Sequence, residues 1–171
     1  PLIFTEHWTG YQPSDGTYRG FLRKRITRLM VKKTSAITTV SKDLKKAMLR
    51  HKLESKYAII PNVVDTQLFK YVPRDRKDRK KRILHISGLG TQKNMVGIIK
   101  TVKKVSEERS DFELIIVGDG PNRNHVEKTA EELGIKNRVV FFLGKKNVAE
   151  VAEIMRNYDF LLLFSNYENS P

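Results

Sequence analysis

The residues best suited to chemistry lie in short loops of the second half of the chain, each between a strand-like and a helix-like segment. The first glycine loop, residues 87–94, contains Gly88, Gly90 and Lys93. Glycines let a backbone approach a ligand closely, and the free N–H groups at the start of the next helix attract an anion. Lys93 adds a positive charge that can pair with phosphate. The loop predicts a phosphate or diphosphate site, and a tight turn with a surface lysine is the alternative.

The second glycine loop, residues 118–121, contains Gly118 and Gly120. These glycines either line a ligand or satisfy a structural need for positive φ. Neither loop has the dinucleotide-binding pattern, because Lys93 stands where the third small residue should be, and the Gly-Lys-Ser/Thr ending of a P-loop is absent. This argues against a nicotinamide-dependent (NAD) oxidoreductase, which stays open as an alternative function.

Two further loops carry polar groups that could bind a nucleotide or a sugar. The third glycine loop, residues 144–147, offers Lys145 and Asn147 to a base or phosphate, and a solvated basic turn is the equal alternative. Residues 165–171 place Glu168 beyond an apolar strand, where an exposed loop glutamate is the plainer interpretation. The signal comes from the loops taken together.

The elements around these loops alternate strictly between strand and helix. We predict strands at residues 83–86, 113–117, 139–143 and 160–164, and helices at residues 94–109, 123–133 and 148–157. Such alternation requires a mostly parallel sheet with helices on both faces, an α/β fold. Ligands of such sheets bind at the carboxyl ends of the strands, which is where the loops lie.

The first half of the chain predicts a β-α-β-α-β pattern. Strands are expected at residues 2–5, 36–40 and 57–60, and a helix capped by Ser41 is expected to end at Arg50. A basic amphipathic helix is expected at residues 18–33. We expect its apolar side to pack on its own sheet, with docking of the basic side on anionic lipid as the sharper hypothesis.

The net charge of +14 is unevenly distributed along the 171 residues. Residues 1–69 carry 13 Lys/Arg against 5 Asp/Glu, residues 70–82 carry 8 against 2, and residues 83–171 carry 12 against 12. Residues 70–82 cannot bury an apolar face and predict an exposed basic linker between two domains. The balanced charge of residues 83–171 argues against a nucleic-acid-binding module, which is the second alternative function.

Several other classes of protein are disfavoured by the composition. No run approaches the roughly 18 apolar residues of a membrane span, and no signal-peptide pattern opens the chain. Cysteine is absent, and neither an Asp-x-Asp motif nor a histidine cluster suggests a metal site. We therefore expect a soluble, cytoplasmic protein without a metal or cofactor. Both ends look cut, because the chain opens at Pro1 beside one strand and stops at Pro171 after another.

Five motifs occur in an order that resembles a known family. They are Pro61-Asn62-Val63, Ser87-Gly88-Leu89 followed by Lys93, Gly118-Asp119-Gly120-Pro121, Phe141-x-Leu143-Gly144, and Ser165 with Glu168 and Pro171. Together they resemble the retaining, GT-B-fold glycosyltransferases of the large "glycosyl transferases group 1" family, over nearly the whole chain. The order and spacing of five motifs are far more specific than any one glycine loop.

The resemblance implies parts of two Rossmann-like domains, with the active site in the cleft between them. Residues 1–69 would be the C-terminal part of the acceptor-side domain, residues 70–82 the basic linker, and residues 83–171 the first part of the nucleotide-sugar donor domain. The implied enzyme transfers a sugar, with retention, from a nucleotide-diphosphate sugar to a glycan or lipid-linked acceptor. Polysaccharide biosynthesis in the cytoplasm, peripheral to the inner face of a membrane, is the implied setting.

The family's functional residues map onto individual positions. Lys93 would contact the donor diphosphate beside Gly88, Gly118 and Gly120, Lys145 and Asn147 would lie near the base, and Glu168 and His7 would be catalytic, near the reacting sugar. The family commonly has arginine where Gly88 stands, which puts donor affinity in doubt. Because both domains would be incomplete, we expect the second half of this chain to fold but the chain to transfer no sugar by itself.

Overall fold

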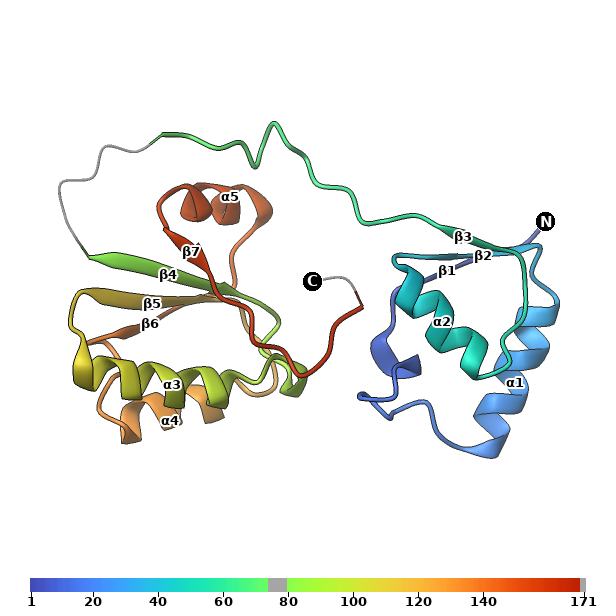
Figure 1. Cartoon of the computed structure of the whole chain (residues 1–171), viewed down its shortest axis with the longest axis horizontal. Coiled ribbons are helices and arrows are strands. Elements are labelled where there is room, and N and C mark those ends of the chain that lie inside the picture. The colour runs from blue at the N-terminus through green and yellow to red at the C-terminus, as the bar shows by residue number, and fades with distance from the viewer. Residues whose placement is uncertain (74–79, 170–171) are drawn as a thin grey trace. The chain divides into compact units, whose positions relative to one another are not determined.

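Two parallel β-sheets, each in its own compact unit, organise the chain (Figure 1). The computed structural model describes residues 1–73 and 80–169. One unit, unit 1, consists of Pro1–Val63 together with residues 166–169, and the other, unit 2, consists of Val64–Ser165. The α/β class with parallel sheets, predicted from the alternation of elements, is confirmed.

Unit 1 contains a three-stranded sheet in the order β1-β2-β3. Its elements are β1 (Ile3–Glu6), the 3-10 turn η1 (Thr9–Tyr11), α1 (Phe21–Lys32), β2 (Ala36–Thr39), α2 (Lys42–Arg50) and β3 (Tyr57–Ile59). Ser41 caps α2 as predicted, because its side chain accepts the N–H of Leu44 at 3.2 Å. The core forms around Ile37 of β2 and Leu44 and Met48 of α2, which are completely buried.

The basic helix α1 differs from its prediction. It begins at Phe21 rather than at Tyr18, and Val31 is its one buried residue. The core beside it is filled by Tyr11 and Tyr18, whose ring centroids lie 4.7 Å apart, and by side chains of α2. The expected packing of the apolar side of α1 on its own sheet is therefore wrong. The apolar residues left exposed are Phe21, Leu22, Ile26, Leu29 and Met30.

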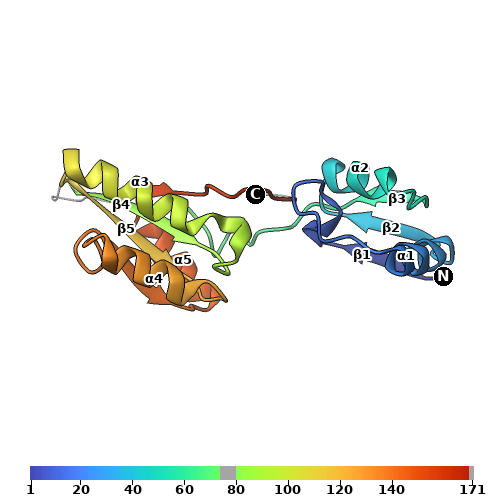
Figure 2. The same ribbon diagram turned by 90° about the horizontal axis from the view of Figure 1, so that it is seen from below.

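Unit 2 contains a four-stranded parallel sheet in the order β6-β5-β4-β7. Its elements are β4 (Lys81–Ile86), the 3-10 turn η2 (Thr91–Lys93), α3 (Met95–Glu108), β5 (Phe112–Val117), α4 (Arg123–Glu132), β6 (Val140–Gly144), α5 (Val148–Arg156) and β7 (Phe160–Leu161). Helices α3 and α4 cover one face of the sheet and α5 covers the other, as Figures 1 and 2 show.

The strand β5 (Phe112–Val117) is apolar at every position except Glu113, and its two faces explain why. Leu114 and Ile116 pack in the core formed with α3 and α4. Ile115 and Val117 point the other way and pack against residues of α5. Successive side chains of a strand face opposite sides of a sheet, so a central strand covered by helices on both faces has apolar residues on both sides.

Some boundaries lie elsewhere than predicted. β4 begins at Lys81, so the last two residues of the predicted linker 70–82 belong to the sheet, while residues 74–79 of that linker lie outside the described residues. Arg82 is held there by a 2.8 Å hydrogen bond from its N–H to Asp159 and by an ion pair with Glu113 at 3.3 Å. These partners come from distant parts of the sequence, which explains why local composition suggested a linker.

Candidate functional site

The three glycine loops converge at the carboxyl ends of β4, β5 and β6. They surround an open pocket of about 570 Å³, lined mainly by loop residues and by Val151 of α5. The loop residues include Ser87, Gly88, Gly118, Gly120, Lys145 and Lys146. Parallel α/β sheets bind their ligands at this edge.

The first two glycine loops touch backbone to backbone. A Cβ atom on Gly118 would collide with the carbonyl oxygen of Ser87, and one on Gly120 would collide with the carbonyl oxygen of Gly88. Gly118 also has a φ of 132°, a conformation that residues with side chains rarely adopt. Glycine is therefore required at both positions for structural reasons, and both glycines also line the pocket. The two interpretations of this loop, a ligand-binding wall and a structural need for glycine, are compatible.

The charged groups of the pocket are of both signs. Lys146 pairs with Glu150 at 3.0 Å, whereas Lys145 is exposed and has no ion-pair partner in the part of the chain that the structure describes. Asp119 accepts the N–H of Gly120 at 2.8 Å and lies 3.7 Å from the guanidinium of Arg123. Lys145 is thus available to an anionic ligand.

Lys93 lies in the first glycine loop but does not line this pocket. It ends the turn η2, and Asn94 after it has a left-handed conformation with φ 48°, so that α3 begins one residue later than predicted. Its positive charge acts on His85, whose pKa it helps to lower. Lys93 therefore lies near enough to the end of β4 for its charge to act on His85, and it does not line the pocket.

Asn147, expected near a nucleotide base, is the N-cap of α5. Its side-chain oxygen accepts the N–H of Glu150 at 2.9 Å, and the Glu150 carboxylate accepts the N–H of Asn147 at 2.9 Å. This reciprocal capping box, together with Lys146, lowers the pKa of Glu150. The structure thus gives Asn147 a role in fixing the start of α5 beside the pocket.

His85 was not identified from the sequence, yet it ties the first glycine loop to the sheet. It is fully buried in β4, with Nε2 at 2.7 Å from Oγ of Ser87 and Nδ1 at 2.8 Å from the carbonyl oxygen of Leu162. Burial lowers its pKa, which favours the neutral ring. A histidine between Leu84 and Ile86, in the apolar part of the strand, is the signal in the sequence that points to it.

His7 and Glu168 belong to unit 1. The buried carboxylate of Glu6 accepts the N–H groups of His7 and Trp8 at 2.9 and 2.8 Å and so fixes the turn that presents the exposed His7. The amide of Asn169, next to Glu168, donates to the carbonyl oxygen of His7 at 2.8 Å. These contacts bring the segments that carry His7 and Glu168 together; Ser170 and Pro171 of the last motif lie outside the described residues.

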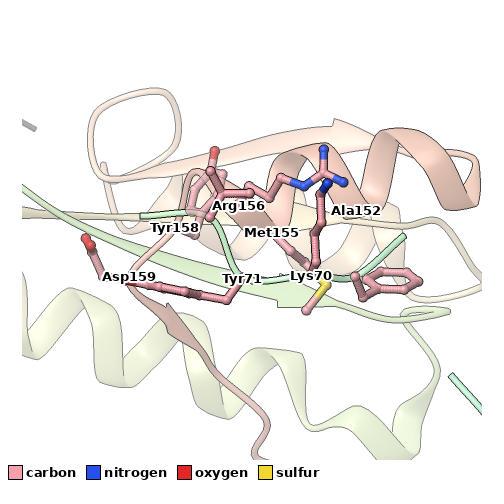
Figure 3. A pocket seen from close by; sticks show the side chains of 9 residues that line it. Lys70, Tyr71, Ala152, Met155, Arg156, Tyr158 and Asp159 are labelled. Carbon is pink, nitrogen blue, oxygen red and sulfur yellow. The ribbon is translucent and has the colours of Figure 1, made fainter. Parts of the chain in front are cut away.

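A second pocket in unit 2, of about 310 Å³, lies between residues 69–72 and helix α5 (Figure 3). It is closed partly by Tyr158 and Asp159, which precede β7, and Arg156 beside it donates to the carbonyl oxygen of Leu68 at 2.8 Å. The pocket therefore faces the amino ends of the strands. Because ligands of such sheets bind at the opposite edge, we do not assign the site to it.

Two further observations concern metals and membranes. The described residues contain no group of three or more His, Asp or Glu side chains placed to hold a metal ion. Among the helices within residues 1–73 and 80–169, none is long and apolar enough to cross a membrane.

Two sequence families match the chain. The family described as "Glycosyl transferases group 1" matches residues 69–171, more than half of the chain, and "Glycosyltransferase Family 4" matches residues 1–68. N-acetyl-alpha-D-glucosaminyl L-malate synthase of Bacillus anthracis is 31% identical over 117 residues, which are 63% of this chain and 29% of that protein. An uncharacterized glycosyltransferase of Methanocaldococcus jannaschii is 24% identical over 153 residues, 82% of this chain and 38% of its own length.

The fold is shared with solved structures of GT-B glycosyltransferases. S. aureus TarM, in a complex with fondaparinux, alpha-GlcNAc-glycerol and UDP, aligns with a TM-score of 0.79 at 16% identity, over 99% of this chain and 33% of that chain. The chain thus spans about a third of TarM, and 38% or less of the curated relatives described here.

Proposed function

The chain belongs to the glycosyl transferases group 1 family, and on that premise we propose that it forms the donor-binding part of an enzyme that transfers a sugar from a nucleotide-diphosphate sugar. The donor's diphosphate binds in the pocket at the carboxyl ends of β4, β5 and β6. The family membership does not favour the two alternatives, an NAD-dependent oxidoreductase and a nucleic-acid-binding module.

One observation above all supports this location for the donor's diphosphate. Three loops that are far apart in the sequence meet at one edge of the sheet, and two of them pack so closely that Gly118 and Gly120 have no room for a side chain. At these glycines the pocket wall is backbone, which can approach a charged diphosphate more closely than side chains can.

The chemistry asked of this pocket is to stabilise a leaving group. When the bond between sugar and phosphate breaks, positive charge grows on the sugar ring and negative charge on the departing diphosphate. Lys145 at the pocket, Lys93 in the first glycine loop and the backbone N–H groups at the start of α3 supply positive potential where this negative charge develops. The solved TarM structure that contains UDP supports the choice of a uridine nucleotide as the first to test.

The finer points of the reaction rest on the family resemblance. We propose that the anomeric configuration is retained, that Glu168 and His7 act at the reacting sugar, and that the acceptor is a glycan or a lipid-linked sugar. The two segments that carry Glu168 and His7 touch through Asn169, which supports a common role. The anomeric proton of the product, followed by NMR from the first turnover of the full-length enzyme, tests retention.

We propose further that α1 contacts an anionic membrane surface at the cytoplasmic face. Its apolar side chains are exposed, Phe21 by 80% and Leu29 by 55%. They line a groove of about 520 Å³ flanked by basic residues, among them Lys24, Arg25 and Lys32. Exposed apolar side chains on a cationic helix are typical of helices that lie in a lipid interface.

Nucleotide binding tests the proposal for the pocket. The chain is titrated with UDP, GDP and ADP by calorimetry, and Lys145→Ala is compared with Lys100→Ala, a substitution on the exposed side of α3. We expect one nucleoside diphosphate to bind, and Lys145→Ala to weaken its binding by about two- to fivefold, since the lysine is exposed. Binding that neither substitution alters would place the diphosphate elsewhere.

A further inference from the structure

His85 stands at the point where the order of the strands reverses. From β4 the chain runs to β5 and then β6 on one side, whereas β7 returns to the other side of β4. Open α/β sheets bind ligands in the crevice at such a reversal. The His85 ring bridges this point, because it extends from β4 to the carbonyl oxygen of Leu162, directly after β7.

The partners of the ring determine where its proton lies. The carbonyl oxygen of Leu162 can only accept a hydrogen bond, so Nδ1 of His85 carries the proton and donates. In the neutral ring Nε2 is then an acceptor, and the hydroxyl of Ser87 donates to it at 2.7 Å. The tautomer follows from the geometry of these two contacts.

The Ser87 oxygen in turn accepts the backbone N–H of Leu89 at 3.2 Å. A continuous chain of hydrogen bonds thus runs from the N–H of Leu89 through Ser87 and His85 to β7, with every donor matched to an acceptor. Leu89 needs such support, because it is fully buried and has a φ of 39°, which is uncommon for a residue with a side chain.

We infer that His85 is a positioning residue of the donor site: through Ser87 it fixes the backbone of the first glycine loop around Gly88. Gly88 lines the pocket, and its carbonyl oxygen is the group that Gly120 packs against. Loss of the chain of hydrogen bonds therefore loosens both loops that face the ligand. The inference deepens the proposed function and rests on it for the identity of the ligand.

The first test does not depend on any ligand. In the ¹⁵N-labelled chain, imidazole nitrogen shifts should show that His85 is protonated on Nδ1 with an unprotonated Nε2. In Ser87→Ala the Nε2 resonance should move, because its donor is gone, and hydrogen exchange of the Leu89 amide should speed up by about fivefold. A proton on Nε2 at neutral pH, or an unchanged Leu89 exchange rate, would overturn the inference.

The second test measures binding of UDP, or of whichever nucleoside diphosphate binds the unsubstituted chain best. Ser87→Ala should weaken binding by about fivefold, and Ser87→Thr, which keeps the hydroxyl, should recover it. Ser106→Ala is the matched control, since its hydroxyl bonds to Lys103 within α3. Thermal unfolding of each variant separates loss of fold from loss of binding.

The outcomes separate this inference from the proposed function. If the unsubstituted chain binds no nucleoside diphosphate, the proposed function fails, and the imidazole and exchange data still decide the hydrogen-bond chain. If the unsubstituted chain binds and Ser87→Ala binds equally well, the positioning role is overturned while the proposed function stands.

Discussion

The carbonyl oxygen of Ser87 occupies the place that a Cβ atom on Gly118 would need. The contact locks the loop after β4 against the loop after β5, and Gly118 has a φ of 132° that disfavours any side chain. Gly118→Ala should therefore lower the free energy of unfolding by about 1–3 kcal/mol, which urea denaturation measures. Gly90→Ala is the matched control, because Gly90 has no atom within 4 Å of its Cβ position. Equal losses in the two variants would contradict the account.

Lys93 should matter for the reaction more than for stability. In a transfer assay on the full-length enzyme, Lys93→Ala should reduce kcat by about 10- to 1000-fold, because a charge near the developing diphosphate is lost. Lys93→Arg should recover part of the loss, and Lys100→Ala should cost little. Wild-type turnover in Lys93→Ala would mean that the diphosphate is held by other groups, with Lys145 the first to examine.

The buried His85 predicts how stability depends on pH. Burial lowers the pKa of His85 below its ordinary value of 6.5, and the charge of Lys93 adds to this while the bond to Leu162 opposes it. Below about pH 6.5 the unfolded chain therefore binds more protons at this histidine than the folded chain does. The contribution of His85 to stability is complete above about pH 6.5 and is lost as the pH falls through the folded-state pKa.

Thermal unfolding from about pH 7.5 down to about pH 5 measures this effect. The melting temperature of the unsubstituted chain should fall toward acid pH more steeply than that of His85→Gln, which has no group to protonate there. The other histidines are present in both proteins, so their contributions to the pH dependence drop out of the comparison. Parallel pH profiles would mean that His85 does not titrate between the folded and unfolded states.

Sequence periodicity predicted unit 2 well, because the pattern of apolar residues in each element there matches the surfaces that the element packs against. β5 is apolar from Leu114 to Val117 and has helices on both faces, and α5 begins directly after its cap Asn147. Prediction failed where a residue's hydrogen-bond or ion-pair partners are distant in the sequence. Arg82 looks like part of a linker until Glu113 and Asp159 are placed beside it.

The site was only partly predictable, for a related reason. Glycine loops at the ends of parallel strands indicated the pocket at Gly88, Gly118 and Gly120, since strand ends meet at one edge of a sheet. The role of His85 depends on the carbonyl of Leu162, which is distant in sequence and has no side-chain signal. Asn147 shows the converse, because its side chain is used locally as a cap rather than in the pocket wall.

The helix α1 should bind acidic vesicles. Co-sedimentation with phosphatidylglycerol vesicles should exceed that with phosphatidylcholine vesicles and fall with added salt, because each Lys/Arg near the surface contributes about 1 kcal/mol. Lys24→Glu combined with Arg25→Glu should reduce it, and Lys100→Glu, on unit 2, should not. Equal binding to both vesicle types, insensitive to salt, would contradict a membrane role and leave the groove to another partner.

The most direct test of the donor pocket is a map of nucleotide binding by NMR. Two-dimensional ¹H–¹⁵N spectra of the chain are recorded during titration with UDP, and with GDP and ADP if UDP does not bind. The account predicts that the amide signals of Gly88, Gly118, Gly120 and Lys145 shift together with one binding curve, while that of Gly134, after α4, stays in place. Shifts that leave the three pocket glycines unchanged would contradict a donor site at the carboxyl ends of β4, β5 and β6.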